Sequence, residues 1–492
     1  MTNTFYLLPV EIWVKIVNFS NETSLLLTNK EFFELSSLID VEQNIFEYVI
    51  RNDYWYILDY VSNLEKNKSE KYPIVCKFKE YTNDLFKYVI EFCISGKLYS
   101  IKRLVSMGAN VREHNDVALN RAVENGHMDI FEYLISKGAD LYANKNTLVR
   151  CASYGGNLDM VKYLISIGAD FRENCDTPLI WACHNGHLEI VKYLVDQGAD
   201  VNSQSHKSII TASKMGHLGI VKYLVSKTTN IDWRHNYAAA FAAQNNHLEI
   251  VKYLVNEGAN LEIEDGCIIR VAAKNGHLDI VKYLVSLGME IGFKKILIGT
   301  SNFGVVNKIT PVIGSAVEGG HLSMVKYFVS IGATIKEKNY AFVKAAEYGH
   351  LEIIKYLVSQ GISLEKKINK ALIVACSKGH LEIVKYLVEN GANVKTNEGL
   401  PLRQACWGNY LDIAKYLVSN GADVTSYDNY ALKTALEKGD LETVKYFISL
   451  GADINDISSW DLENISRLGR SEVLEYLKTT FNIKLSLSNI YF

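Results

Sequence analysis

The stretch GHLEIVKYLVDQGAD, residues 186–200, decides the fold because the chain repeats it. It returns as NHLEIVKYLVNEGAN at 246–260 and as GHLDIVKYLVSLGME at 276–290. Its Lys-Tyr pair recurs at intervals that are mostly 30 residues, at Lys162, Lys192, Lys222, Lys252, Lys282, Lys326, Lys355, Lys385, Lys415 and Lys445. Lys102, Glu132 and Glu475 occupy the equivalent position, which makes thirteen copies. A fixed period of this length predicts a solenoid of stacked repeats.

One copy reads as two helices joined by a tight turn. In DTPLIWACHNGHLEIVKYLVDQGAD (176–200) we expect a first helix over 178–185 and a second over 188–197, with Gly186 breaking the first. The second helix carries an apolar stripe of Leu188, Val191, Leu194 and Val195. Neither helix can bury such a stripe alone, so stacking of neighbouring copies supplies the core.

The repeat resembles the ankyrin repeat over about residues 95–480. Residues 176–202 carry the family's T-P-L-x-x-A…G-H-x-x-I-V-x-x-L…G-A-D-V-N signature almost complete. The resemblance implies an all-α ankyrin-repeat solenoid that binds other proteins through its fingers and concave face. The period of 30 in place of 33 predicts short finger loops. The T-P-L motif is complete only at 177–179, so the family's Thr–His hydrogen bond is not expected in every copy.

Composition narrows the function classes. The chain has 492 residues, of which 48% are hydrophobic and 22% charged, with a formal net charge of −3. A nucleic-acid binder would usually carry a strong basic excess. The 8 cysteines form no CxxC pair, which disfavours zinc and a disulfide framework. No secretory signal or run of ~20 apolar residues is present. We therefore expect a cytoplasmic monomer that binds neither nucleic acid nor membrane.

Residues that recur at the same position of the repeat are best explained by a structural role. Eight histidines share one position in the turn, where bonding to the backbone explains the recurrence better than catalysis or metal binding: His127, His187, His217, His247, His277, His321, His350 and His380. The Lys-Tyr lysines follow a glutamate three residues earlier at 189–192 and 249–252, which favours a solvated face over a nucleic-acid stripe. Cys183, Cys376 and Cys406 share an apolar position. We expect no catalytic residues, metal or cofactor.

Residues that break the repeat pattern are the candidates for binding. Aromatic side chains supply much interface energy, so the candidate partner-binding residues are Trp181, Trp233, Tyr237, Tyr340, Trp407 and Tyr430. Each could instead fill space between neighbouring fingers. The interval from Lys282 to Lys326 is 44 residues, 14 more than the period, and the insertion falls within 289–312. Insertions often lie on the binding face, so we expect this loop to contact a partner.

The N-terminal segment, residues 1–45, does not follow the period. LLPVEIWVKIVNFSNETSLLLTNKEFFEL (7–35) resembles an F-box, which implies that Leu8, Pro9, Ile12 and Ile16 dock a Skp-type subunit of a cullin ubiquitin ligase. A helical cap for the solenoid is the alternative. We divide the rest into a degenerate repeat and loop at 46–95, the solenoid at 96–480 and a C-terminal cap at 481–492.

The amino-acid sequence of the repeats is similar to that of ankyrin proteins from giant DNA viruses of the mimivirus kind. That similarity implies action inside an infected host cell, on a host protein. Two functions remain open from the sequence: a protein-binding scaffold alone, or a substrate receptor that links a host protein to a ubiquitin ligase through the F-box-like segment.

Overall fold

The computed structural model is helical throughout the residues that it describes, which are 50, 51, 55, 85–228, 233–260, 267–292, 311–362, 364, 365 and 367–481. These residues form thirteen helix pairs, from α7 and α8 to α31 and α32, and confirm the predicted all-α solenoid. The F-box-like segment with Leu8, Pro9, Ile12 and Ile16 lies outside the described residues. So do most of 46–84, the inserted residues 293–310, and 482–492.

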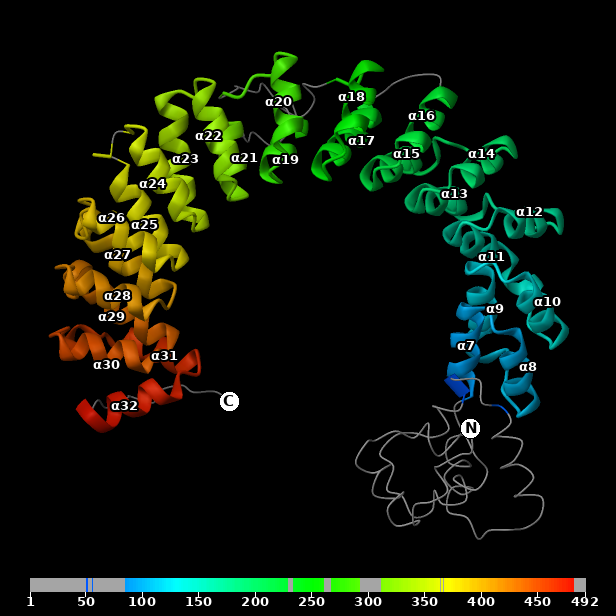
Figure 1. Cartoon of the computed structure of the whole chain (residues 1–492). Coiled ribbons are helices and arrows are strands. Elements are labelled where there is room, and N and C mark those ends of the chain that lie inside the picture. The colour runs from blue at the N-terminus through cyan, green and yellow to red at the C-terminus, as the bar shows by residue number, and fades with distance from the viewer. Residues whose placement is uncertain are drawn as a thin grey trace, which may run out of the picture. The chain divides into compact units, whose positions relative to one another are not determined.

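The chain divides into two compact units at Thr228. The first unit stacks five helix pairs, which Figure 1 shows from blue to green. Its helices are α7 (Phe86–Ser95), α8 (Leu98–Ser106), α9 (Glu113–Glu124), α10 (Met128–Ser136), α11 (Leu141–Gly155), α12 (Leu158–Ser166), α13 (Glu173–Asn185), α14 (Leu188–Asp196), α15 (Ser203–Met215) and α16 (Leu218–Lys227).

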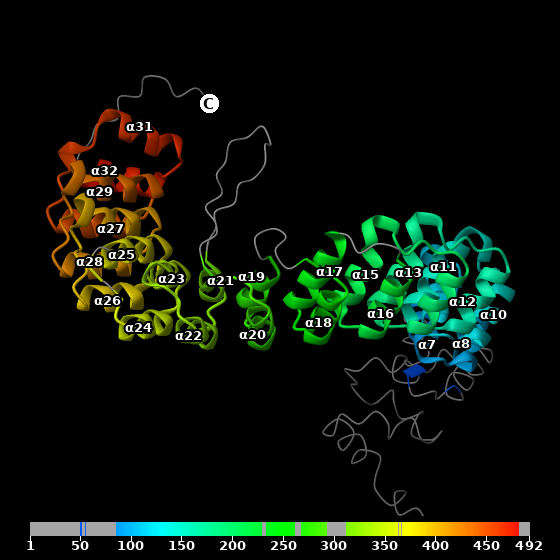
Figure 2. The same ribbon diagram turned by 90° about the horizontal axis from the view of Figure 1, so that it is seen from above.

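The second unit stacks eight helix pairs in chain order, as the turned view in Figure 2 shows for α23 to α29. A 3-10 turn, η5 (Ile454–Asp456), precedes the last pair. The helices are α17 (Trp233–Gln244), α18 (Leu248–Asn256), α19 (Cys267–Lys274), α20 (Leu278–Ser286), α21 (Val312–Glu318), α22 (Leu322–Ser330), α23 (Ile335–Tyr348), α24 (Leu351–Ser359), α25 (Ile368–Lys378), α26 (Leu381–Glu389), α27 (Thr396–Trp407), α28 (Leu411–Ser419), α29 (Ser426–Lys438), α30 (Leu441–Ser449), α31 (Ser459–Arg467) and α32 (Ser471–Phe481).

The quoted stretch forms α14 for local reasons. It has no Gly or Pro inside, Glu189 lies in its first turn, and Gly198 follows its end with a φ of 93°. Ile190, Val191 and Leu194 are at most 1% exposed. Burial of each such side chain contributes about 1.5–3 kcal/mol. The same three positions are buried in the second helix of every pair, so the repeated sequence forms the core.

The recurring histidines tie each repeat to the one before it, as expected. The Nε2 atoms of His187 and His217 lie 3.0 Å from the carbonyl oxygens of Tyr154 and His184, 33 residues earlier. His127, His277 and His380 make the same contact. The rings of His127, His187, His217 and His380 also lie close to the glycine of the preceding turn: a Cβ on Gly186 would come within 2.6 Å of the His217 ring. These histidines are scaffold residues.

A second row of locked residues, missed in the sequence, shapes the shortened fingers. Asp116, Asp176, Gly399 and Asn429 occupy one repeat position and have φ between 51° and 72°. Asp, Asn and Gly tolerate this left-handed conformation best. At the same position, the side chains of Asn146, Asn236 and Asn369 accept the backbone N–H 24 residues later.

The fingers are thereby reduced to short turns. The sequence predicted that the first helix starts at residue 178, and a regular helix does follow Asp176, which has a φ of 56°. The element α13 as a whole begins five residues before 178, at Glu173. The chain turns at the left-handed residue and continues directly into the helix, so residues expected in a finger loop form the helix's first turn.

The insertion leaves the repeat register intact. The N–H of Val312 donates to the carbonyl oxygen of Ile291 at 3.0 Å, so the two ends of the inserted segment meet. His321 lies 2.9 Å from the carbonyl oxygen of Lys274, 47 residues earlier, and 47 − 14 = 33 is the usual separation. The solenoid therefore continues across the insertion without a shift.

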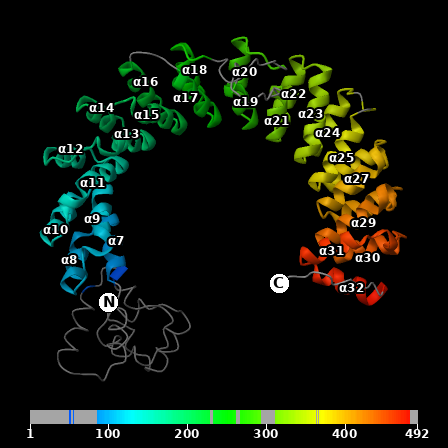
Figure 3. The same cartoon turned by 180° about the vertical axis from the view of Figure 1, so that it is seen from behind.

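Each unit curves. Within a unit, the first helices pack closely on the first helices of both neighbouring repeats, whereas the second helices meet far less. The first helices therefore lie on the inner side of each curve and the second helices on the outer side, as Figures 1 and 3 show for α9 to α16. The inner side of each unit is the surface that holds the residues which vary between copies.

Candidate functional site

The inner face of the first unit contains a shallow hollow of about 240 Å³, which we call the Trp181 hollow. It spans three consecutive first helices, α9, α11 and α13. Its lining residues are Arg121, Glu124, Arg150, Cys151, Tyr154 and Trp181. Trp181, named from the sequence as a candidate, thus faces an open surface.

Aromatic rings form one wall of the Trp181 hollow and an ion pair forms another. The Trp181 and Tyr154 ring centroids are 5.3 Å apart at 71°, an edge-to-face contact, and Tyr154 is 40% exposed. Across from them, a guanidinium nitrogen of Arg121 lies 2.6 Å from a carboxylate oxygen of Glu124. The positive charge of Arg121 is therefore compensated inside the hollow, while Arg150 is exposed to water.

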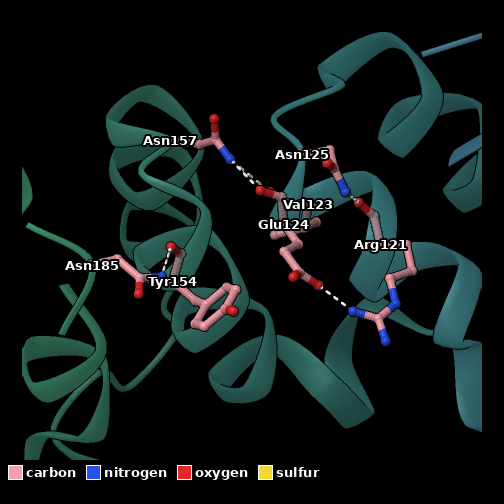
Figure 4. A network of polar contacts seen from close by, with 7 residues as sticks. All are labelled: Arg121, Val123, Glu124, Asn125, Tyr154, Asn157 and Asn185. Carbon is pink, nitrogen blue, oxygen red and sulfur yellow. Dashed lines mark hydrogen bonds and ion pairs between the residues drawn. The ribbon is translucent and has the colours of Figure 1, made fainter. Parts of the chain in front are cut away.

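Amide side chains hold the ends of the helices that carry this hollow (Figure 4). The amide nitrogen of Asn157 donates to the carbonyl oxygen of Glu124 at 2.7 Å, and that of Asn185 donates to the carbonyl oxygen of Tyr154 at 2.6 Å. Both amides come from the following repeat. They fix the backbone beneath Glu124 and Tyr154, so the wall residues project from rigid positions.

The second unit carries a hollow of about 290 Å³ on its inner face, the Trp407 hollow. It lies between the neighbouring first helices α27 and α29. Its lining residues are Leu400, Arg403, Gln404, Trp407 and Tyr430. Two of the aromatic candidates from the sequence, Trp407 and Tyr430, meet here, and Trp407 is 54% exposed.

Cations lie against aromatic rings around the Trp407 hollow. The guanidinium carbon of Arg403 lies 4.2 Å from the ring centroid of Tyr427 and 5.3 Å from that of Tyr430. The ammonium of Lys438 lies 4.2 Å from the ring centroid of Trp407. Such contacts hold a cation in place while keeping its charge available. Among the described side chains, those that line this hollow include no carboxylate.

The remaining sequence candidates take other places. Tyr340 is half-buried and lies against the preceding repeat, where a Cβ on Gly314 would come within 2.7 Å of its ring. Burial raises the pKa of Tyr340, and the charge of Lys344 opposes that rise. Tyr237 is half-buried on α17. The side chain of Trp233 lies outside the described residues. Neither hollow includes these three residues, and their role in binding stays a prediction.

Sequence reasoning missed three residues that shape the two hollows: Tyr154, Arg403 and Tyr427. Glu124, Tyr154 and Trp407 occupy the same repeat position, three residues before the histidine position. Comparing the copies at that one position would have identified Glu124 and Tyr154 beside Trp407, but not Arg403 or Tyr427, which lie at other repeat positions.

The outer face is internally compensated. Exposed lysines of the Lys-Tyr series pair with the glutamate three residues earlier, at N–O distances of 2.7 to 3.3 Å: Lys192 with Glu189, Lys252 with Glu249, Lys355 with Glu352, Lys385 with Glu382, and Lys445 with Glu442. Others lie over the tyrosine of the next repeat, as Lys102 does over Tyr133 at 5.6 Å. The predicted solvated face with weak ion pairs is confirmed for these copies.

The locked cysteines fill the core. Cys183, Cys376 and Cys406 are at most 3% exposed, and burial raises the pKa of each thiol. Within the described ranges, no group of three or more His, Cys, Asp or Glu is placed to hold a metal ion. Among the same residues, no helix combines the length and the apolar run needed to cross a membrane.

Known proteins share this organisation. A family model of ankyrin repeats in three copies matches residues 148–235, 228–295, 292–368 and 365–428, and a model of ankyrin repeats in many copies matches 119–165. The chain is 98% identical over 373 residues to the ankyrin repeat protein R634 of Acanthamoeba polyphaga mimivirus, which covers 76% of this chain and 77% of that protein.

More distant matches are shorter. The ankyrin repeat protein L63 of the same virus is 44% identical over 131 residues, 27% of this chain and 21% of that protein. The crystal structure of the human ASB11 ankyrin repeat domain aligns at 21% identity and a TM-score of 0.33, covering 40% of this chain and 90% of that one. The family models and the long viral match show that the chain belongs to the ankyrin repeat family.

Proposed function

We propose that this chain is a scaffold that binds a partner protein on the inner faces of its two units, with the Trp181 and Trp407 hollows as anchor sites. The observation that carries the proposal is the position of the pattern-breaking tryptophans. Both line open hollows on the face where the copies differ. Exposed tryptophan and tyrosine side chains in shallow hollows are typical of the residues that dominate protein–protein binding energy.

The charge distribution supports the same face. Lysines of the outer helices pair with glutamates of their own helix, so much of their charge is already compensated. On the inner face, aromatic side chains and cations lie together without such regular pairing. The similarity to mimivirus proteins favours a host protein as the partner. The scaffold itself needs no catalytic group or cofactor for this function.

A quantitative capture experiment tests the proposal. The full chain, Trp181→Ala, Trp407→Ala and the control Tyr99→Ala are used as baits in amoebal lysate, and the bound proteins are compared by mass spectrometry. Tyr99 is 63% exposed on the outer helix α8, so it is close to Trp407 (54%) in exposure but lies on the other face. We expect at least one protein to be retained by the wild type and Tyr99→Ala and lost from a tryptophan variant. Equal retention by all four baits would exclude the inner face.

A second proposal rests on the sequence of residues 7–35. In it, the F-box-like segment presents the bound protein to a ubiquitin ligase, with Ile12 at the contact with the Skp-type subunit. Recovery of that subunit by the wild type but not by Ile12→Asp is expected. If the wild-type chain recovers no ligase subunit, the chain is a scaffold alone.

The inserted loop is a further proposed contact. Because Ile291 and Val312 already meet through a backbone hydrogen bond, deleting 293–306 should leave the neighbouring repeats folded. We expect weaker capture of the partner by the deletion variant at unchanged helical content. Unchanged capture would remove the loop from the binding surface.

A further inference from the structure

We propose that the Trp407 hollow binds an acidic side chain, Asp or Glu, within an extended segment of the partner protein, with an apolar neighbour of that residue against Trp407. The proposal rests on the proposed function and specifies the chemistry of one of its two anchor sites. It follows from three properties of the hollow: a fixed cation, no compensating anion among the described residues that line it, and an exposed aromatic surface.

Arg403 is held in position before any partner arrives. Its guanidinium carbon lies 4.2 and 5.3 Å from the ring centroids of Tyr427 and Tyr430, which themselves pack edge to face at 5.9 Å. One terminal nitrogen, Nη2, donates to the backbone carbonyl of Asn397 at 3.2 Å. A planar guanidinium fixed in this way loses little conformational freedom when it binds a carboxylate.

The charge of Arg403 is partly dehydrated and uncompensated. Its Nε atom is buried and has no hydrogen-bond partner among the residues that the structure describes. Within the same residues, Arg403 forms no ion pair, whereas Arg121 in the Trp181 hollow lies 2.6 Å from Glu124. Removing water from a cation without supplying an anion costs free energy, and an incoming carboxylate recovers part of it. The complementary group is therefore an anion, which none of the described residues supplies at Arg403.

Trp407 determines which kind of residue should stand next to the acidic residue of the partner. It is 54% exposed, and the ammonium of Lys438 lies 4.2 Å from its ring centroid, adding a second cation beside the hollow. Leu400 contributes an apolar edge. The hollow is shallow and lies between two helices. It therefore fits a short extended peptide better than a small molecule, which usually binds in a pocket that encloses most of its surface. An acidic residue next to an aliphatic or aromatic one matches both parts of the surface.

The first test is an unbiased peptide selection. A phage-displayed library of random peptides is panned against the immobilised full chain and, in parallel, against Arg403→Gln. We expect peptides enriched on the wild type to carry Asp or Glu beside Leu, Phe or Trp, and this consensus to disappear on Arg403→Gln. A selection that gives no peptides, or peptides without an acidic consensus, overturns the proposal.

The second test locates the contact. The affinity of the consensus peptide is measured by calorimetry with the wild type, Arg403→Gln, Arg403→Lys and the control Lys385→Gln, a cation on the outer helix α26. We expect Arg403→Gln to weaken binding roughly tenfold or more, and Lys385→Gln to leave it unchanged. Arg403→Lys keeps the charge but loses the planar contact, so an intermediate affinity is expected. Circular dichroism checks that each variant folds.

The outcomes separate the two proposals. If the peptide binds and Trp407→Ala weakens it while Arg403→Gln does not, the hollow is an anchor site but not an acidic-residue site. If neither variant matters, the inner face of this unit is not where the peptide binds, and the proposed function fails for this unit as well. If a phosphoserine in place of the acidic residue binds a hundredfold more tightly, the site recognises phosphorylated partners and the proposal is overturned.

Discussion

In the Trp181 hollow, the guanidinium of Arg121 lies 2.6 Å from the carboxylate of Glu124. In the Trp407 hollow, Arg403 lies against two tyrosine rings, and the described lining residues include no carboxylate. Both hollows lie on the first helices of their unit. Arg150 occupies the repeat position of Arg403 but is exposed to water. One unit therefore presents a compensated aromatic surface, and the other presents an aromatic surface with a free positive charge.

The comparison shows how a repeat protein varies its chemistry on a constant scaffold. Glu124 and Trp407 stand at the same repeat position, three residues before His127 and Tyr410. Beneath them the core is equivalent, because Leu119 and Leu402 also share one repeat position and are at most 1% exposed. Changes at the inner surface alone convert one type of hollow into the other, so the two hollows can be altered separately in experiments.

The largest effect is expected from truncating the buried leucine beneath each hollow. This change tests whether the core is equally stable under the two hollows. Leu119→Ala and Leu402→Ala each remove a fully buried side chain and should cost about 2–5 kcal/mol of local stability. Because repeat proteins do not unfold in a single step, hydrogen exchange of the amides in α9 and α27 is the suitable measurement. Losses of similar size in the two helices are expected. A small loss of stability in one helix would mean that the core beneath its hollow is less tightly packed.

The next largest effect is a difference in alkylation rate between a cysteine that lines one hollow and a cysteine buried in the core near the other. Cys151 lines the Trp181 hollow and is half-buried, whereas Cys406 lies under the Trp407 hollow at 3% exposure. Alkylation of Cys406 requires local opening, so Cys151 should react faster by roughly a hundredfold or more, as mass spectrometry of iodoacetamide-treated protein would show.

The pH dependence of that reaction has a defined sign. Burial raises the pKa of the Cys151 thiol, an effect that the charge of Arg150 opposes. Only the thiolate reacts, so a raised pKa leaves less of the reactive form at pH 8. The alkylation rate of Cys151 should therefore keep rising as the pH increases beyond about 8.5, the pKa of an unperturbed thiol. A rate that levels off below pH 8 would contradict the burial of this thiol.

Trp407→Glu is expected to convert the Trp407 hollow toward the compensated type. The new carboxylate stands four residues after Arg403 on α27, a spacing at which helical side chains meet. It would compete with an acidic peptide for the guanidinium, so peptide affinity should fall roughly tenfold below that of Trp407→Ala, which loses only the aromatic surface. Calorimetry with the two variants gives the comparison directly. Equal affinities would mean that charge contributes nothing at this site.

The sequence predicted the helix pairs well because the signals that form them are local and repeated. The positions of Ile190, Val191 and Leu194 are hydrophobic in nearly every copy, and the turn glycines recur nearly as often, so each copy carries the same local signals. The finger geometry was less accessible. It depends on the left-handed backbone at Asp116, Asp176 and their equivalents, and the sequence shows only a preference for Asp, Asn and Gly there.

The candidate sites were predicted in part. Trp181, Trp407 and Tyr430 were identified because a large aromatic residue interrupts a regular pattern. Arg403 and Tyr427 were missed, since arginine and tyrosine on a helix surface are common and their contact appears only when two repeats are stacked. The pairing of Arg121 with Glu124 was visible as an i, i+3 spacing, but its function in the hollow was not, because it depends on the ring of Trp181 two repeats later.

The smallest expected effect comes from releasing the compensated charge. Glu124→Gln removes the partner of Arg121, and since the pair is partly exposed it should cost only a few tenths of a kcal/mol of stability. Arg121 and Arg150 would then both stand uncompensated beside the rings of Tyr154 and Trp181. We expect the Trp181 hollow to gain a few-fold in affinity for the acidic consensus peptide. The gain is limited because Arg150 is exposed and water screens its charge.

That gain is best measured where the other hollow no longer contributes. In a Trp407→Glu background, peptide binding at the second unit is already weakened, so calorimetry of Trp407→Glu against Trp407→Glu with Glu124→Gln isolates the first unit. Higher salt should reduce the gain, because an exposed charge pair is screened more strongly than a dehydrated one. If the double variant binds the peptide no better than Trp407→Glu alone, charge compensation does not distinguish the two hollows, and the difference must come from the burial of Arg403 between its tyrosines.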